Sequence, residues 1–292
     1  MLTFLPMETV REDRPRSRVA RRSSIGLIRE AIREVRSRQR LVRYLVQADL
    51  TKKGANTLLG NVWWVLDPLL QMVVYVVFVT IVVGNRTEGY PLFIFSAILP
   101  WKWFTSSVGD GVTSVTSQEK IIKQVQFPKI VLPLAAVTGG IGSFAFGLIP
   151  LGALLVLFYA SHISPWLVLI PVIAAVQYVF TLALVVFLSA ANVFFRDIGN
   201  LSRHVLRLWF YLSPALYGAA QIEKVDAKGG IVATLFKLNP WTTLFESYRN
   251  VIFYGTAPLW SALAIVLIAS TLTLCLTTVF FKRVEPSFAK VL

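Results

Sequence analysis

The sequence predicts an all-α integral membrane protein with six transmembrane helices, an amphipathic interfacial helix before them and a re-entrant helical hairpin before the last. Of its 292 residues, 55% are hydrophobic and only 15% are charged, and the mean hydropathy is +0.65. Soluble domains carry about 25% charged residues. Several apolar runs approach the ~20 residues that cross a ~30 Å hydrocarbon layer as a helix. These numbers exclude an ordinary soluble enzyme, a disordered chain and a fibrous protein.

The N-terminal part of the sequence is strongly basic. Residues 1–60 contain 14 of the 29 Lys and Arg residues, and the net charge is +14. Residues 1–26 have no apolar core of a signal peptide and predict a disordered, basic cytoplasmic tail. Within residues 27–60, apolar side chains recur at helical spacing between arginines, which predicts an amphipathic helix in the membrane interface. The alternative is a solvated helix that packs on a partner protein.

Residues 61–292 predict a domain of six transmembrane helices. The third span is rich in glycine, which suits close helix packing in lipid. Residues 229–255 are too polar for a seventh span and are broken at Asn239-Pro240, so they predict a re-entrant or surface hairpin. The expected spans are 62–83, 91–108, 130–159, 166–194, 204–220 and 258–281.

The orientation follows from the distribution of basic residues. With the N-terminus inside, the expected inner segments carry 23 Lys and Arg residues and the outer segments carry five. Cytoplasmic segments collect this excess, so both termini are expected in the cytoplasm, on a multi-pass protein of the cytoplasmic (inner) membrane. This placement of charge favours a membrane protein over a nucleic-acid-binding one. Arginine outnumbers lysine 18 to 11, which favours a GC-rich genome.

The sequence holds no residue pattern of an enzyme site. The motifs GxxxxGK[ST], GxSxG, HExxH and CxxC are absent, so no phosphate-binding loop, nucleophile elbow or metal site is expected. His162 and His204 are isolated and are expected to be structural, and Cys275 is the one cysteine. Six spans without an enzyme site favour a pore-forming subunit, a transporter or a membrane anchor.

Four stretches resemble the permeases of ABC-2 type transporters that export lipid-linked O-antigen, teichoic acid and related polysaccharides. They include the motifs QEKIIKQVQFPKIVLP and SAANVFFRDIGNLSRH. Their order and spacing agree with the family over about residues 48–290. The sequence departs at Lys53-Gly54-Ala55, where members often carry Arg-Tyr and then Gly-Ser. The four stretches are residues 48–78, 97–133, 189–218 and 238–255.

The resemblance implies that two copies form a channel for a polyprenyl-diphosphate-linked glycan above two copies of an ABC ATP-binding subunit. It places ATP and Mg²⁺ on that separate subunit. The chain is therefore expected to be no enzyme and to have no cofactor, metal ligand or catalytic residue. Membrane lipids are its other expected partner. Among specific glycans, a cell-wall galactan is the first candidate substrate. One alternative is an exporter of teichoic acid, lipid or drug. Another is an ATP-independent channel, for which no filter loop or charge ring is evident. A third is an anchor for a glycosyltransferase.

Residues 111–129 predict an inner loop that contains a short helix parallel to the membrane. Phe127-Pro128 ends that helix, because proline disfavours helix at the residue before it. The resemblance implies that this is the coupling helix that contacts the ATP-binding subunit, whereas the alternative is a plain connecting loop. The residues expected to make the contact are Gln118, Glu119, Lys120, Ile121 and Lys123.

Aromatic residues of the expected spans suggest a path for a glycan, because aromatic rings stack on the apolar faces of sugars. The alternative is the aromatic belt of the membrane interface, which is favoured for Trp63 and Trp64 at the inner edge. Packing against neighbouring helices is the further alternative. The residues expected to line the path are Tyr75, Phe78, Tyr211 and Tyr217.

Asp67 and Lys102 are charged residues inside expected spans. A charge near the centre of the bilayer costs at least about 2.5–3.5 kcal/mol, so each should face protein, water or an opposite charge. Their expected depths are close but unequal, so no ion pair between them is expected. At the inner surface, Arg196 and Arg203 are candidates to contact phosphate.

Overall fold

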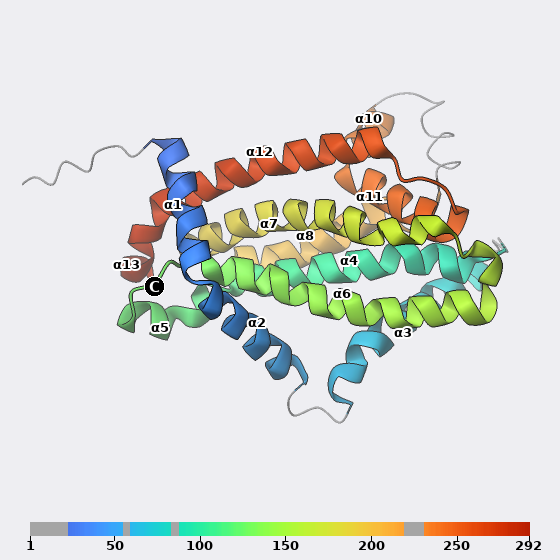
Figure 1. Ribbon diagram of the computed structural model, residues 1–292, viewed down its shortest axis with the longest axis horizontal. Coiled ribbons are helices and arrows are strands. Elements are labelled where there is room, and N and C mark those ends of the chain that lie inside the picture. The colour runs from blue at the N-terminus through green and yellow to red at the C-terminus, as the bar shows by residue number, and fades with distance from the viewer. Residues whose placement is uncertain (1–22, 55–58, 83–87, 219–230) are drawn as a thin grey trace, which may run out of the picture.

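The computed structural model describes residues 23–54, 59–82, 88–218 and 231–292, and these ranges are mostly helical, with no strand among them (Figure 1). Most of the tail predicted for residues 1–26 therefore lies outside the described residues. The longer helices are α1 (Ser24–Ser37), α2 (Gln39–Gly54), α3 (Trp63–Val77), α4 (Tyr90–Thr113), α6 (Val131–Phe158), α7 (Ile170–Phe194), α8 (Ile198–Leu212), α11 (Pro240–Arg249) and α12 (Trp260–Val284). The shorter helices are α5 (Glu119–Gln124), α10 (Ile231–Leu238) and α13 (Phe288–Val291).

Helix α4 forms the centre of the bundle. It packs against α3, α6, α7, α8 and α11, and most of its side chains are buried. Its Trp101 meets Trp241 of α11 edge to face, with the ring centroids 4.7 Å apart. Trp209 of α8 also meets Trp101 edge to face. Aromatic pairs of this kind add about 0.5–1.5 kcal/mol each beyond the area that they bury, so the core is held by aromatic contacts between three helices.

The glycines of α6 allow its neighbours to approach closely, as predicted. A Cβ atom on Gly140 would lie 2.2 Å from the Ser107 hydroxyl, and one on Gly147 would lie 2.1 Å from Leu99, both on α4. On another face, a Cβ on Gly142 would lie 3.1 Å from Leu50 of α2. Small residues at helix contacts let backbones come together in lipid, and here they fit α6 between α2 and α4.

Four helical segments are long and apolar enough to cross a membrane: Trp63–Ile81, Val131–Phe158, Pro165–Phe194 and Trp260–Val291. They correspond to the first, third, fourth and sixth expected spans. The other two expected spans correspond to α4 and α8. Helix α8 has 15 residues and begins at Ile198 rather than 204, and α4 becomes polar from Lys102 onward. The coarse prediction of a helical membrane protein is therefore confirmed.

The amphipathic segment differs from the single helix expected for residues 27–60. It forms two helices, α1 and α2, that are separated at Arg38. Helix α1 packs on α12 near the C-terminus, whereas α2 packs on α6 (Figure 1). Gly142, which contacts the end of α2, lies 11 residues into α6, or about 17 Å at 1.5 Å per residue. The segment that leads into α3 thus starts well along the bundle.

The break predicted at Asn239-Pro240 separates α10 from α11. Asn239 caps α11 by accepting a hydrogen bond from the Trp241 backbone N–H, at 3.1 Å. The same side chain accepts from the indole N–H of Trp209 and donates to the Ser213 hydroxyl. The break is therefore tied to the end of α8.

Candidate functional site

Networks of polar contacts lie toward the two ends of the bundle. Helices α1, α5 and α13 meet at one end, together with the C-terminus (Figure 1). Helices α10 and α11 approach the end of α8 toward the other end.

The predicted coupling loop contains a short helix, α5, with one buried anchor. Ile122 is 5% exposed and belongs to a small apolar cluster with Val115, Phe281 and Phe288. The side chain of the neighbouring Ile121 is half exposed. Lys120 and Lys123 are also exposed, and Gln118 is partly so. The loop is thus fixed by one face and presents the other face outward.

Glu119 joins the loop to the segment before α8, a contact that the sequence did not predict. Its carboxylate accepts a hydrogen bond from Lys123 at 2.7 Å and lies 3.4 Å from the guanidinium of Arg196, which precedes α8. The Lys123 hydrogen bond, with Arg196 beside it, lowers the pKa of Glu119 below its ordinary value of 4.5. A lowered pKa means that these contacts stabilise the fold above about pH 4.5 and are lost as the pH falls further.

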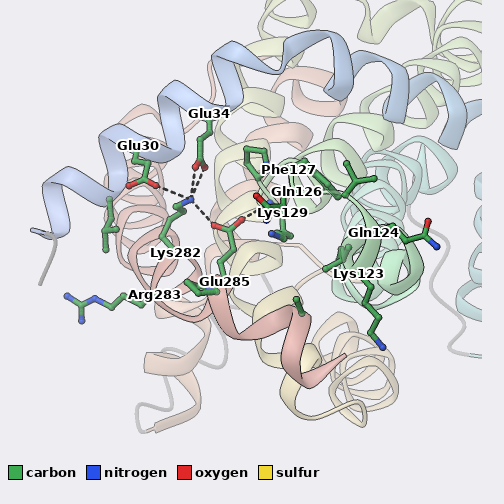
Figure 2. A pocket seen from close by; sticks show the side chains of 16 residues that line it. Glu30, Glu34, Lys123, Gln124, Gln126, Phe127, Lys129, Lys282, Arg283 and Glu285 are labelled. Atoms are coloured by element: carbon green, nitrogen blue, oxygen red, sulfur yellow. Dashed lines mark hydrogen bonds and ion pairs between the residues drawn. The ribbon is translucent and has the colours of Figure 1, made fainter. Parts of the chain in front are cut away.

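Beside the loop is a groove of about 980 Å³ between α1, the segment after α5 and the end of α12 (Figure 2). Lys282 of α12 lies at its edge and is 9% exposed. Its ammonium donates to Glu34 of α1 at 2.8 Å and pairs with Glu285 at 2.7 Å. The other oxygen of Glu285 accepts from the Lys129 backbone N–H at 2.6 Å. One ammonium therefore joins α1, α12 and, through Glu285, the segment that follows α5.

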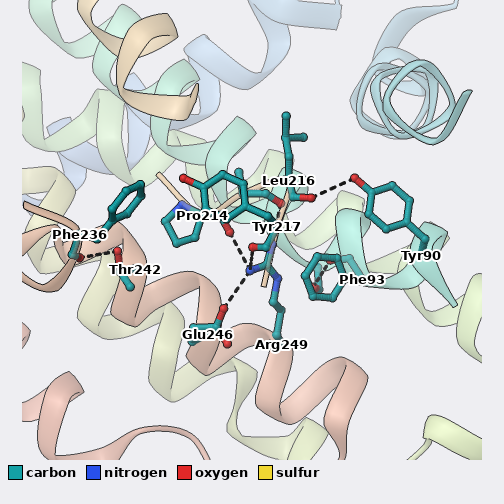
Figure 3. A network of polar contacts seen from close by, with 11 residues as sticks. Tyr90, Phe93, Pro214, Leu216, Tyr217, Phe236, Thr242, Glu246 and Arg249 are labelled. Carbon is teal, nitrogen blue, oxygen red and sulfur yellow. Dashed lines mark hydrogen bonds and ion pairs between the residues drawn. The ribbon is translucent and has the colours of Figure 1, made fainter. Parts of the chain in front are cut away.

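A buried arginine, Arg249 of α11, organises the opposite end (Figure 3). It is 0% exposed, and its guanidinium lies 3.9 Å above the ring of Phe93. It pairs with Glu246 at 3.0 Å and donates to the backbone carbonyls of Pro214 and Ala215 at 2.7 and 2.6 Å. The carbonyl groups belong to the segment after α8, so the arginine ties α11 to the backbone of that segment.

Sequence analysis did not single out Arg249. The available signal was a Glu and an Arg three residues apart, Glu246 and Arg249, in a stretch rich in aromatic residues. Residues at this spacing lie on one face of a helix. A charge pair flanked by Phe245, Tyr248 and Phe253 favours burial with partners, because buried charges require them.

The four aromatic residues expected in a glycan path are not brought together as a set. Tyr75 packs on Phe210 of α8, with ring centroids 5.6 Å apart, and Tyr211 meets the same ring at 5.5 Å. Phe78 is 48% exposed on the continuation of α3. Tyr217 lies elsewhere, edge-on to Phe236 at 6.0 Å. Tyr75 and Tyr211 thus form one group around Phe210, and Tyr217 belongs to the region of Arg249.

The expectation for Asp67 and Lys102 was wrong: their charged groups lie 3.6 Å apart. The estimate of depth assumed that the helix with Asp67 starts at the membrane surface. Because α2 reaches the level of Gly142 before the chain turns into α3, Asp67 is deeper than its place in α3 suggests. Both residues line one pocket with Ser143 of α6.

The two arginines expected to meet phosphate have different surroundings. Arg196 is 69% exposed on its side chain and takes part in the ion pair with Glu119. Arg203 is exposed on α8 and donates to the side chain of Asn200. No group of three or more metal-ligating side chains occurs within the described ranges.

Curated relatives identify the family. No protein-family model matches the chain. The O-antigen export system permease protein RfbA of Myxococcus xanthus is 32% identical over 259 residues, which cover 89% of this chain and 98% of that protein. Two proteins of the same name from Klebsiella pneumoniae are 26% identical over 253 residues and 29% identical over 217 residues, covering 95% and 81% of their own lengths. The chain belongs to the family of ABC-2 type O-antigen export permeases.

Proposed function

We propose that the chain is the channel-forming subunit of an ABC transporter that exports a lipid-linked, O-antigen-like polysaccharide across the cytoplasmic membrane. The observation that carries this proposal is the similarity to O-antigen export permeases over nearly their whole length. The all-helical bundle with four apolar helices of membrane-crossing length supports it. Helices α4 and α8 complete six spans in this proposal, and α10 and α11 form the hairpin before the last.

Both termini lie in the cytoplasm in this proposal. Helices α1, α5 and α13 meet at one end of the bundle (Figure 1), and the inner segments assigned from the sequence hold most of the Lys and Arg residues. Basic residues collect on the cytoplasmic side. The exposed arginines Arg196 and Arg203 lie at this end, where the diphosphate of a lipid-linked glycan would enter.

The coupling loop is the contact with a separate ATP-binding subunit. Its outward face offers Lys120, Ile121 and Lys123, and its inward anchor Ile122 packs with Phe281 of α12 and Phe288 of α13. Closure of an ATP-binding pair would press on the outward face, and the anchor would pass the motion to the bundle. ATP and Mg²⁺ belong to the partner, whose hydrolysis drives export.

Two copies of the chain form the channel. A single copy exposes apolar side chains along α3 and the helical segment that follows it, among them Leu70, Val74 and Ile81. Helix α8 exposes Leu201, Leu208 and others in the same way. Soluble homo-oligomers most often have two-fold symmetry, and the proposal takes the same arrangement for the two copies. Tyr75, Phe78 and Tyr211 line the glycan path between the copies.

Depletion of the chain in its own host tests the proposal. Lipid-linked glycan should accumulate in the inner leaflet, and a copy of the chain supplied in trans should restore export. The measurement is the glycan on each leaflet, detected by a membrane-impermeant lectin or enzyme. A second arm inactivates ATP hydrolysis in the partner subunit and should give the same accumulation. Undiminished export after depletion would rule out the proposed function, and export that persists without hydrolysis would favour an ATP-independent channel.

A further inference from the structure

The inner half of α4 exposes polar residues only. Seventeen residues of α4 are buried, and they include every apolar side chain from Trp103 onward. A helix that faces lipid would expose apolar side chains instead. The residues of this half that keep accessible surface are Lys102, Thr105, Ser106, Gly109, Asp110 and Thr113.

These residues form one stripe along the helix. Lys102, Ser106, Asp110 and Thr113 are spaced by four, four and three residues, which places them on one face. The Ser106 hydroxyl donates to Asp110 at 3.5 Å. From Lys102 to Thr113 the stripe covers 11 residues, or about 17 Å along the axis, and it runs toward the end of the bundle where α5 lies (Figure 1).

The polar stripe continues on α3. Lys102 pairs with Asp67, and Gln71 and Tyr75 follow Asp67 at intervals of four residues. The side-chain oxygen of Gln71 is buried and has no hydrogen-bond partner. Tyr75 then meets the aromatic group around Phe210 of α8. We call the stripe on α4 together with Asp67, Gln71 and Tyr75 the polar line.

The ion pair at the bend of the polar line is accessible from outside the chain. The side chain of Asp67 is 55% exposed and that of Lys102 is 38% exposed. Ionisable groups at membrane depth face water, protein or one another, because lipid cannot solvate them. The Lys102 ammonium lies 3.6 Å from one Asp67 carboxylate oxygen, which is longer than an ordinary hydrogen bond. Both groups therefore keep hydrogen-bonding capacity for a third partner.

The pocket around this pair has the chemistry of a sugar site. Its volume is about 370 Å³, near the lower end of the ~300–1,000 Å³ range of ligand pockets. Trp64 offers a ring, Asp67 accepts from hydroxyls, and Lys102 donates to them. Ser143 adds a hydroxyl from α6. Because the two charges cancel, the pocket has no net attraction for anions, and neutral hydroxyl groups suit it better than phosphate does.

We propose that the polar line forms the inner half of the glycan path and that the Asp67–Lys102 pocket is a subsite for sugar hydroxyl groups, an inference that rests on the proposed export function. A glycan entering from the cytoplasmic end meets Thr113, Asp110 and Ser106 before it reaches the pocket. It then passes Gln71 and Tyr75, where stacking on aromatic rings replaces hydroxyl contacts. The weak, repeated contacts hold no single unit tightly, which suits a long chain in transit.

Accessibility of single cysteines to a water-soluble methanethiosulfonate reagent tests the polar line. In the full transporter carrying Cys275→Ser, Ser106→Cys and Thr113→Cys are compared with Ile141→Cys. Ile141 is a matched control, because it follows Gly140, which contacts Ser107 of α4, and its apolar side chain is 41% exposed. A thiol in apolar surroundings stays protonated and reacts slowly, so both stripe positions should react at least about tenfold faster.

Export measured before and after labelling gives the second readout. Labelling at Ser106→Cys should block export, whereas labelling at Ile141→Cys should not. Equal reaction rates at stripe and control positions would overturn the proposal, and so would rapid labelling of the stripe that leaves export unchanged. The reaction rates need no export assay, so failure of the proposed function would be recognised separately, by export that continues without the chain.

A separate experiment tests the Asp67–Lys102 subsite. The double variant Asp67→Leu and Lys102→Met removes both charges together, so that neither charge is left without its partner at membrane depth. Export should fall severalfold while the protein remains in the membrane and ATP hydrolysis by the complex persists. Export equal to that of the parent would remove the subsite from the proposal.

Discussion

Arg249 has no exposed surface and is surrounded by carbonyl oxygens, one carboxylate and one aromatic face. Its planar fork reaches two adjacent carbonyl groups at once, which an ammonium cannot do in the same way. Through these contacts one side chain holds α11 against the segment that follows α8. The sequence placed this residue in a polar interruption before the last span, so its burial could not be predicted without knowing that the end of α8 lies beside it.

Removal of the Arg249 guanidinium should destabilise the protein strongly. Breaking one partner of a buried ion pair costs about 3–5 kcal/mol, so Arg249→Met should lower the unfolding temperature of the purified protein by several degrees. Arg249→Lys should recover only part of the loss. Glu246→Gln keeps the carbonyl contacts and should cost less than Arg249→Met. An unfolding temperature of Arg249→Met equal to that of the parent would show that the network contributes little.

The pair between Glu119 and Arg196 predicts a rescue experiment. Glu119→Arg places like charges side by side and should release the loop from α8, so that the ATP-binding subunit co-purifies poorly and export falls. Exposed ion pairs contribute only about 0.2–1 kcal/mol, so the protein should still fold and insert. The double variant Glu119→Arg with Arg196→Glu restores the opposite charges and should recover most of the export.

A matched control for this prediction is Lys290→Glu, which changes an exposed charge on α13 at the same end of the bundle. It should leave co-purification unchanged. If the double variant were as defective as Glu119→Arg alone, the carboxylate would be acting on the partner subunit directly rather than by positioning the loop.

At the scale of single helices, α6 shows where sequence reasoning succeeds. Its glycines predicted close packing because small residues in a long apolar segment have few other uses, and the structure places Gly140 and Gly147 against α4. The pairing of α3 with α4 was predicted less well. Depth had to be counted from an assumed start at the membrane surface, and the insertion of α2 beside α6 moved that start.

Two glycines of α6 give a direct comparison. A Cβ on Gly147 would lie 2.1 Å from Leu99, whereas one on Gly152 would meet nothing within 4 Å. Gly147→Ala should therefore destabilise the protein by about 1–3 kcal/mol, the typical cost of overpacking. Gly152→Ala should be neutral or stabilise it by up to about 1 kcal/mol, because alanine favours helix over glycine. Thermal unfolding of the two variants side by side checks the difference, and equal shifts would contradict it.

At the scale of the whole molecule, the sequence predicts that no phosphate-binding loop is present, because such a loop has a strict pattern. The helical membrane character followed from the length of the apolar segments, which the thickness of the bilayer determines. The candidate sites followed less completely. Tyr75 and Tyr211 do share a group, but Tyr217 was assigned to them although it lies beside Arg249, because depth in a span does not determine which helix face a side chain occupies.

The purified chain without a partner should hydrolyse no ATP. Phosphates are bound by a glycine-rich backbone loop with a lysine in ATPases of this class, and the sequence contains no Gly-Lys pair. ATP turnover should appear only on addition of the ATP-binding subunit and disappear when the catalytic site of that subunit is inactivated. Stoichiometric turnover by the isolated chain, free of contaminating ATPase, would contradict the assignment as a transport subunit.

The contact between Lys282 and α1 can form only late in biosynthesis. Its partner Glu34 precedes it by 248 residues, so α1 leaves the ribosome long before the side chain that will fix it to α12. At about 5–20 residues per second, the interval is roughly 12–50 s. During this time the contact between α1 and the end of α12 cannot form. The groove between α1, the segment after α5 and the end of α12 is therefore completed only when the last helix has been made.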